Sequence, residues 1–330
     1  MRVSIAGKSV ELTDILGEGG EARVFRHNGL AVKIWKQAND PTIPDHERKA
    51  VAKKLLLAPA KLAAFPNFQF SNVIAPLNAV HDEVGKTIIG YTMPLVNEIT
   101  VPIRKWSERN FAINLDWQVM RRGLMDLWYS VKSLHGAGIV WGDANDLNVL
   151  MAGSGTPYII DCDSFQYGKF QCTAFTQRFG DWRLMDRGDL VKPHDVGSDW
   201  YAWAIMVYQS LTGVGPWDGT PQVNRAGKVG CWDASIKIPK WAIPHQNLSE
   251  GMRHVFETLF LTSDRTPPSP DFIGQRRDCS KCGRWVWGDK CACGLTERPT
   301  KMATTVYHQG IGKIVDAWVY NDTIHFVEKR

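Results

Sequence analysis

The sequence predicts an α+β protein with a β-rich N-terminal part, a helical middle part and a small cysteine-rich C-terminal part. Short apolar strands and a glycine cluster fill the first hundred residues, and apolar residues then recur at the three- and four-residue steps of amphipathic helices. Four of the 7 cysteines fall between residues 279 and 293. With 44% hydrophobic and 22% charged residues, the 330-residue chain has an ordinary globular composition, which excludes collagen-like and disordered proteins.

A β-hairpin is the clearest element of the N-terminal part. Asn28-Gly29 supplies the positive φ angles of a tight turn, and it separates apolar runs at residues 24–26 and 30–34. The other elements predicted here are strands at residues 3–5, 10–12 and 87–93 and a helix at residues 45–57, which is rich in Lys, Ala and Leu.

A long amphipathic helix opens the middle part. Its apolar stripe consists of Trp117, Met120, Leu124, Leu127, Val131 and Leu134. Two more helices are predicted at residues 199–211, ended by Thr212-Gly213, and at residues 248–261. The Pro-rich residues 266–270 mark a boundary. Beyond it, the predicted strands are residues 315–320 and 324–327, joined by a turn at Asn321-Asp322.

Charge and cysteine usage indicate a cytoplasmic protein. The net charge of +5 is too mild over this surface to indicate a nucleic-acid partner. Residues 1–8 lack the apolar core of a signal peptide, and no run approaches the roughly 18 apolar residues that a membrane span needs. Clustered cysteines favour a metal site in a reducing compartment over a disulfide framework.

The glycine cluster at residues 16–24 fits the pattern G-x-G-x-x-G-x-V, with alanine in the third glycine position. The matching residues are Gly17, Gly19, Ala22 and Val24. Glycine lets backbone N–H groups close over phosphates, and the valine would cover an adenine ring. An ordinary turn is the alternative. A dinucleotide-binding motif would need a helix directly after the glycines, whereas a strand follows here.

Lys33 lies inside the apolar run that follows this loop, where it could hold phosphate oxygens. Such a lysine needs a carboxylate to orient it, and Glu47 is available on the predicted helix. Glu47 shares a helical face with Val51 and Leu55, which directs it toward the core. The alternatives are a surface lysine and a solvated glutamate.

Two acidic segments complete the pattern. Asp143 follows an apolar strand, and Asn148 comes five positions later, which is the D-x-x-x-x-N spacing of a kinase catalytic loop. That chemistry needs a carboxylate for the substrate hydroxyl and an amide oxygen for a metal. Asp161 ends the next apolar strand, where it could chelate the metal that bridges the phosphates.

In this order, the motifs resemble those of the eukaryotic-like protein kinases over about residues 10–270. The resemblance implies a two-lobed kinase-like fold that binds ATP and Mg²⁺ or Mn²⁺, with a β-rich N-lobe at residues 1–97 and a helical C-lobe at residues 98–270. Within it, Asp143 would be catalytic, Lys33 and Glu47 an ion pair, and Asn148 and Asp161 the metal ligands. The phosphate loop would be Gly17, Gly19 and Ala22, and Asp199 would brace the catalytic-loop backbone.

The chain departs from these kinases at several positions. Gly142 stands where an arginine precedes the catalytic aspartate, so we expect no dependence on activation-loop phosphorylation. Asn145 replaces the lysine that contacts the transferring phosphate, and Asp163 replaces the glycine of Asp-Phe-Gly. Asp146 and Asp163 would be solvated loop acids or ligands of an extra metal ion. A nucleotide-binding pseudokinase scaffold and a small-molecule kinase are therefore the alternatives to a protein kinase.

A metal ribbon is predicted in residues 271–330, together with the C-terminal strands. Its ligands would be Cys279, Cys282, Cys291 and Cys293, in a C-x-x-C and a C-x-C pair. Four thiolates are typical of structural Zn²⁺ and leave no open position for catalysis, so the metal would hold together a segment with little core. Free thiols or a redox pair are the alternatives. Basic and aromatic residues around the cysteines favour a protein-docking face over nucleic acid.

A narrower resemblance follows from the kinase motifs, the ribbon and the wording Ile-Asp-Cys-Asp-Ser-Phe-Gln at residues 160–166. Together they are similar to bacterial kinases encoded beside a von Willebrand factor A protein and a PP2C-type phosphatase in tellurite-resistance-associated systems. This resemblance implies a Ser/Thr protein kinase in stress or defence signalling. It also implies a protein substrate and those two proteins as partners.

Overall fold

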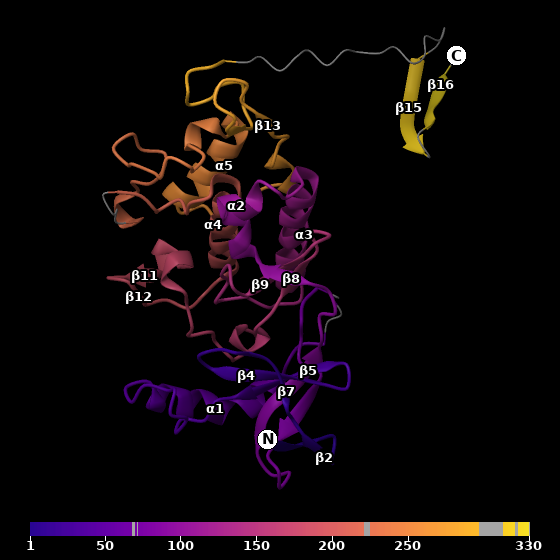
Figure 1. The fold of residues 1–330 in the computed structure, drawn as a ribbon, viewed down its shortest axis with the longest axis vertical. Coiled ribbons are helices and arrows are strands. Elements are labelled where there is room, and N and C mark those ends of the chain that lie inside the picture. Colours follow the sequence, from indigo (N-terminus) through magenta and orange to yellow (C-terminus); the bar gives the residue numbers. More distant parts are fainter. Residues whose placement is uncertain (68–69, 71, 221–224, 297–312, 321–322, 330) are drawn as a thin grey trace.

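The computed structural model describes residues 1–67, 70, 72–220, 225–296, 313–320 and 323–329. It combines a curled antiparallel sheet with a helical region, as the α+β prediction requires. The sheet and helix α1 (Arg48–Ala63) form one end of the molecule in Figure 1, and helices α3 (Trp117–Gly136), α4 (Val196–Thr212) and α5 (Glu250–Leu261) form the other.

The sheet has seven antiparallel strands in the order β2-β1-β6-β7-β5-β4-β3. The predicted hairpin is confirmed, because β4 and β5 pair from Ala22↔Trp35 to His27↔Leu30 and both turn residues have positive φ. The strands are β1 (Arg2–Ile5), β2 (Lys8–Glu11), β3 (Asp14–Glu18), β4 (Ala22–His27), β5 (Leu30–Trp35), β6 (Asn78–His81) and β7 (Ile88–Pro94).

Each face of the sheet has its own apolar cluster. Val32 and Ile34 of β5 pack on one face, whereas Ala31 and Trp35 pack on the other, together with Leu62 of helix α1. This division follows from the alternation of side chains along a strand. The predicted helix at residues 45–57 is shifted to Arg48–Ala63, because the chain makes a turn in which the Glu47 N–H donates to the Pro44 carbonyl, 2.9 Å away.

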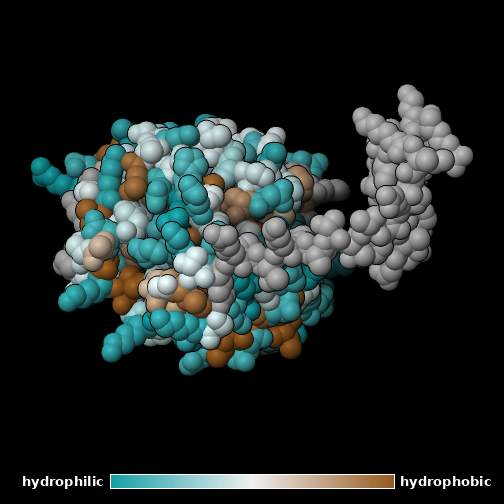
Figure 2. Space-filling model, turned by 90° about the horizontal axis from the view of Figure 1, so that it is seen from above, coloured by the Kyte–Doolittle hydropathy of each residue, from teal (hydrophilic) through white to brown (hydrophobic). Residues whose placement is uncertain are grey.

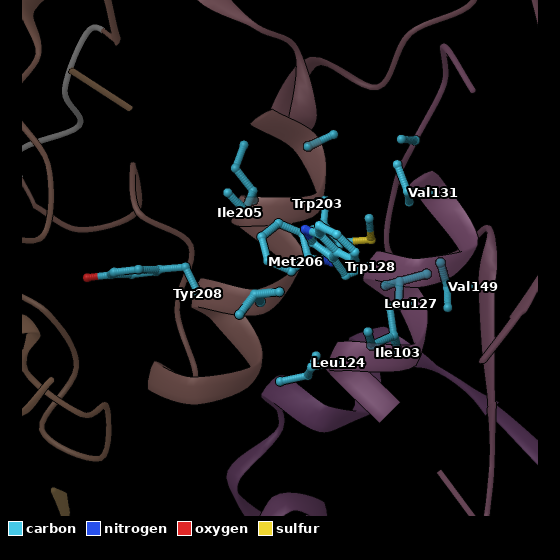
Figure 3. Close-up of a cluster of buried hydrophobic side chains, with 14 of the residues drawn as sticks. Ile103, Leu124, Leu127, Trp128, Val131, Val149, Trp203, Ile205, Met206 and Tyr208 are labelled. Carbon is cyan, nitrogen blue, oxygen red and sulfur yellow. The ribbon is translucent and has the colours of Figure 1, made fainter. Parts of the chain in front are cut away.

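The helical region surrounds α4, which is buried at every residue except Val196. Figure 3 shows Leu127 and Trp128 of α3 against Trp203 and Met206 of α4. All three predicted helices are confirmed, with N-caps at Asp116, Asp195 and Ser249. The smaller elements here are β8 (Thr100–Pro102), α2 (Arg109–Ala112), β9 (Val149–Ala152), β10 (Pro157–Ile159), β11 (Met185–Asp186) and β12 (Asp189–Leu190).

The C-terminal part contains two small sheets. One pairs β13 (Arg277–Asp278) with β14 (Trp285–Val286), and the other pairs β15 (Lys313–Tyr320) with β16 (Thr323–Lys329). The predicted C-terminal strands are therefore confirmed, while the turn predicted at Asn321-Asp322 lies outside the described residues. Hydrophobic residues on the face in Figure 2 form separate patches among hydrophilic ones. Within the described part of the chain, every helix is too short or too polar to cross a membrane.

A buried ion pair joins the segment before α4 to the segment after α5. Arg265 donates two hydrogen bonds, of 2.9 and 2.8 Å, to the Asp181 carboxylate. The Asp181 side chain is inaccessible to solvent, and Arg183 also donates to it. Removing one member of such a pair strands a buried charge. The pair therefore fixes the packing of these two segments.

We expect Arg265→Ala to lower the free energy of unfolding by about 3 kcal/mol, because Asp181 loses its bidentate partner. Urea denaturation measures this loss. The matched control is Arg26→Ala, whose exposed pair with Asp14 should contribute about 0.5 kcal/mol or less. Equal losses in the two variants would contradict the role of the buried pair.

Candidate active site

Lys33 lies where the sheet meets the helical region. It belongs to β5, between β4 and β7, and strand alternation directs its side chain to the face of Ala31 and Trp35. The side chain is 9% exposed, and its ammonium donates to Asp161 Oδ1 and to Asp163 Oδ1, the latter at 2.5 Å. A contact between residues 128 positions apart thus connects the sheet to the loop after β10.

Asp163 is held from several directions. Its carboxylate also accepts from Trp35 Nε1 at 3.1 Å and from the Tyr91 hydroxyl at 3.0 Å, and its carbonyl accepts from Lys61 Nζ at 2.7 Å. Only 11% of the Asp163 side chain is exposed, compared with 31% for Asp161. The prediction of a solvated loop acid is therefore wrong for Asp163, because strands β5 and β7 supply its partners.

The three charges shift one another's pKa values. Burial alone would lower the pKa of Lys33, but the carboxylates of Asp163 and Asp161 outweigh it and raise that pKa. Burial and the neighbouring Asp163 charge raise the pKa of Asp161 to about 7. Burial opposes the ionisation of Asp163 as well, but the Lys33 charge prevails and holds the Asp163 pKa well below its usual range. Asp163 is therefore the permanently charged partner of Lys33.

Glu47 does not contact Lys33 in this structure. Its side chain is 55% exposed and lies 3.6 Å from His46 Nε2. Helix α1 instead directs lysines toward the site, since Lys61 donates to the Asp163 carbonyl and Lys54 pairs with Glu21 at 2.5 Å. The predicted Lys33–Glu47 ion pair is thus replaced by contacts to Asp161 and Asp163. The turn before α1, which moves the helix start past Glu47, is the reason.

The glycine loop connects β3 to β4. Nothing lies within 4 Å of the positions that a Cβ would take at Gly17 and Gly19, so backbone N–H groups there are open to a ligand. The Gly19 N–H donates to the Ala22 carbonyl at 2.9 Å, and Val24 pairs with Gly17 across the strands. Glu18 anchors the loop, since its carboxylate accepts from the buried Lys36 at 2.9 Å and lies 3.3 Å from Arg23.

The loop that carries Asp143 is organised by amide side chains. Asn148 Nδ2 and Asn145 Nδ2 each donate to the Asp143 carbonyl at 3.1 Å. The Ile160 N–H donates to the Asn148 carbonyl at 3.0 Å, which connects this loop to the strand before Asp161. The structure therefore brings together two predicted groups, Asp143 with Asn148 and Lys33 with Asp161, on neighbouring loops.

Two further residues of this site were missed in the sequence. The Thr176 hydroxyl donates to Asp143 Oδ1 at 2.9 Å, and Asn145 Nδ2 also reaches that hydroxyl at 3.2 Å. Thr176 is 33 positions from Asp143, so no local pattern could have found it. Asn145 accepts from two backbone N–H groups ahead of it in the chain, an Asx-turn that its position in an Asp/Asn-rich loop could have signalled.

Asp146 also differs from the solvated loop acid that the sequence suggests. Its side chain is 1% exposed. Its Oδ2 atom accepts from Arg104 Nε at 3.1 Å and from Gln209 Nε2 at 2.9 Å. Asp146 therefore anchors the catalytic loop to α4 and is not directed at solvent.

The predicted bracing by Asp199 is confirmed. Its carboxylate, fully buried in α4, accepts from the Trp141 N–H at 2.7 Å and the Gly142 N–H at 2.9 Å, and it contacts His135 Nε2 at 2.8 Å. Gly142 has φ of +80°, and a Cβ there would meet Cys172 at 2.7 Å. Both the backbone angle and the packing require glycine, which explains why no arginine precedes Asp143.

We expect Gly142→Ala to lower the free energy of unfolding by about 2–4 kcal/mol, since it adds both a left-handed alanine and a clash with Cys172. Chemical denaturation measures the loss. Gly136→Ala at the end of α3 is the control, because open space surrounds its Cβ position. Alanine there should leave stability unchanged or raise it by up to about 1 kcal/mol. A tolerated alanine at residue 142 would contradict the packing argument.

The four C-terminal cysteines form a cluster that could bind a metal ion such as zinc. Their sulfur atoms all lie within 4.8 Å of one another, with 3.6 Å between Cys279 and Cys293 and 3.5 Å between Cys282 and Cys291. Tetrahedral Zn²⁺ with Zn–S bonds of about 2.3 Å separates its sulfurs by about 3.8 Å, so the spacing fits.

The ribbon around these cysteines is packed on the helical region. Asn247, fully buried, donates to the Trp285 carbonyl and accepts from the Ala292 N–H, both at 2.8 Å, and its Nδ2 lies 3.6 Å from Cys291 Sγ. Trp287 stacks edge-on against Trp117 of α3, 5.5 Å between ring centres. The metal cluster therefore shares hydrogen bonds and core contacts with the helices.

We expect a zinc chelator, or Cys282→Ser, to lower the Tm of the helical transition by roughly 5–10 °C, because the ribbon contacts contribute to the same core. Thermal unfolding followed by far-UV circular dichroism measures the shift. The chelator should cause no further shift in the Cys282→Ser variant. An unchanged Tm in both cases would show that the ribbon folds independently of the helices.

Comparisons with known proteins support a kinase-like relationship. The supporting relative is the protein kinase YegI of Escherichia coli O157:H7, which is 23% identical over 248 residues. The matched region covers 72% of this chain and 37% of that protein, so the chain spans little more than a third of the relative's length. No family model matches the chain.

Proposed function

We propose that the chain is a two-lobed protein kinase, with residues 1–97 as N-lobe and 98–270 as C-lobe, that transfers the γ-phosphoryl group of ATP to a Ser or Thr hydroxyl. The observation that carries this proposal is the contact of Lys33 with Asp161 across the junction between sheet and helical region. It joins the glycine-loop hairpin to the neighbouring loop of Asp143 and Asn148. The kinase-named relative supports the same class of reaction.

In this proposal each group has a defined task. The open backbone at Gly17 and Gly19 and the Lys33 ammonium bind the phosphates. Asn148 and Asp161 supply the oxygen ligands that suit Mg²⁺, which would neutralise charge between the β- and γ-phosphates. Asp143 accepts the proton of the substrate hydroxyl as its oxygen bonds to the γ-phosphorus and the bond to ADP breaks.

Thr176 would hold Asp143 in place for this step. Its hydroxyl donates to one carboxylate oxygen, Oδ1, and so fixes the rotation of the carboxyl group. The other oxygen is the one left for the substrate. A positioned base of this kind typically contributes about 10²–10⁴-fold to the rate.

A nucleotide-binding pseudokinase scaffold is the second candidate. The observation that favours it is Asn145, which stands where the related kinases have a cation and is engaged with Asp143, Thr176 and the backbone. A neutral amide there leaves less positive charge for the transition state. In that case ATP would bind without phosphate transfer, and the ribbon would recruit partners.

The two candidates are separated by incubating the wild type and Asp143→Asn with Mg·ATP and a generic acceptor protein, and then measuring intact mass. We expect the wild type to add phosphate and Asp143→Asn to lose at least about 100-fold in rate. Asp161→Ala should abolish metal-dependent transfer. The control is Asp186→Asn, an exposed acid on β11, which should retain full rate. ATP binding without transfer in the wild type would establish the pseudokinase.

The proposal extends to a role in bacterial stress or defence signalling, with a von Willebrand factor A protein and a PP2C-type phosphatase as partners. It rests on the resemblance of residues 160–166 and the cysteine ribbon to kinases of that kind. Removal of the added phosphate by the phosphatase encoded beside the kinase would support it, and retention of the phosphate would count against it.

A further inference from the structure

We propose that Asp163 is the positioning residue that orients Lys33 toward the phosphates, the task that the sequence assigns to Glu47. This inference rests on the kinase function proposed above and concerns only the group that holds its lysine. Asp163 lies at the meeting point of β5, β7, α1 and the loop after β10, since it contacts Lys33, Trp35, Tyr91 and Lys61.

Helix α1 cannot supply the orienting carboxylate. Its sequence from Arg48 to Ala63 contains no aspartate or glutamate, and its side chains nearest the site include the lysines Lys54 and Lys61. Glu47 precedes the helix and is more than half exposed. A carboxylate on another element must therefore balance the buried Lys33 charge, because an unpaired buried ammonium is strongly disfavoured.

The two carboxylates that contact Lys33 differ in how firmly they are held. Asp163 Oδ1 receives both Lys33 and the Tyr91 hydroxyl, and its Oδ2 receives the Trp35 indole N–H. These donors come from strands inside the sheet, so they fix both oxygens. Asp161 is about three times more exposed, with 31% of its side chain accessible against 11%. Of the two, Asp161 is free to turn toward a metal ion.

This difference divides the work between the two residues. If Asp161 directs its oxygens at Mg²⁺, its contact with Lys33 weakens, and Asp163 remains as the anchor of the ammonium. An ammonium has three donors. One is used by Asp163, and at least one is then available to a phosphate oxygen. The lysine is thereby held in the direction from which the phosphates approach, at no further cost in side-chain entropy when ATP binds.

The test compares Asp163→Asn with the matched control Glu47→Gln and with Asp161→Asn. We expect Asp163→Asn to lower kcat/KM for Mg·ATP at least about tenfold, because a misdirected phosphate ligand costs this much or more. Its affinity for adenosine and the Mg²⁺ concentration for half-maximal rate should stay within about twofold of wild type. Glu47→Gln should match the wild type throughout, whereas Asp161→Asn should raise the Mg²⁺ requirement.

Tyr91→Phe provides a second, milder variant in case Asp163→Asn folds poorly. It removes one donor to Asp163 and keeps the ring in the core, and we expect a smaller loss of kcat/KM with unchanged adenosine affinity. A raised Mg²⁺ requirement in Asp163→Asn would identify a metal ligand, and an equal loss of adenosine affinity would identify a purely structural residue. Either result overturns the inference.

Full activity of Asp163→Asn, or a loss in Glu47→Gln, would also overturn the inference and leave the proposed kinase function standing. A wild type that neither binds ATP nor transfers phosphate would instead refute the kinase function, and the inference would fall with it. The two failures are therefore distinguished by the wild-type measurement alone.

Discussion

The buried carboxylate of Asp199 is the constraint on which the arrangement of the site depends. It lies in the most buried helix of the protein and takes the backbone N–H groups of Trp141 and Gly142, which precede Asp143. A charged acceptor without solvent access must keep its donors, so the loop cannot move without breaking charge-assisted hydrogen bonds. The left-handed Gly142, the packing of Cys172 against it and the direction of Asp143 all follow from this anchor.

Elements defined by local periodicity could be predicted from the sequence, whereas contacts between distant loops could not. The Asn28-Gly29 hairpin, the three long helices and the cysteine cluster each depend on residues close together in the chain. The orientation of Glu47 depends on where α1 begins, and a shift of a few residues changes the face on which a helical side chain lies. The roles of Asp163 and Thr176 depend on partners far away in sequence, which no local pattern encodes.

The cysteine ribbon shows a second kind of difference. The sequence indicates a segment with little core of its own, and this is correct for its internal apolar cluster, which is small. The missing core is supplied by the helical region, where Trp287 joins the main cluster and Arg276 lies between the rings of Trp117 and Trp285. Composition reveals that a segment needs support, but it does not reveal which surface provides that support.

The anchoring of the glycine loop by Glu18 has a consequence for access to the site. Its partners, Lys36 and Arg23, hold the loop by charge and not by apolar packing. An apolar anchor would hold equally well in any dilute buffer, whereas ion pairs with exposed members weaken as dissolved ions screen them within about 8 Å at physiological ionic strength. The ease with which the loop opens is therefore coupled to the salinity of the surrounding solution, so osmotic change acts on this protein at its entrance.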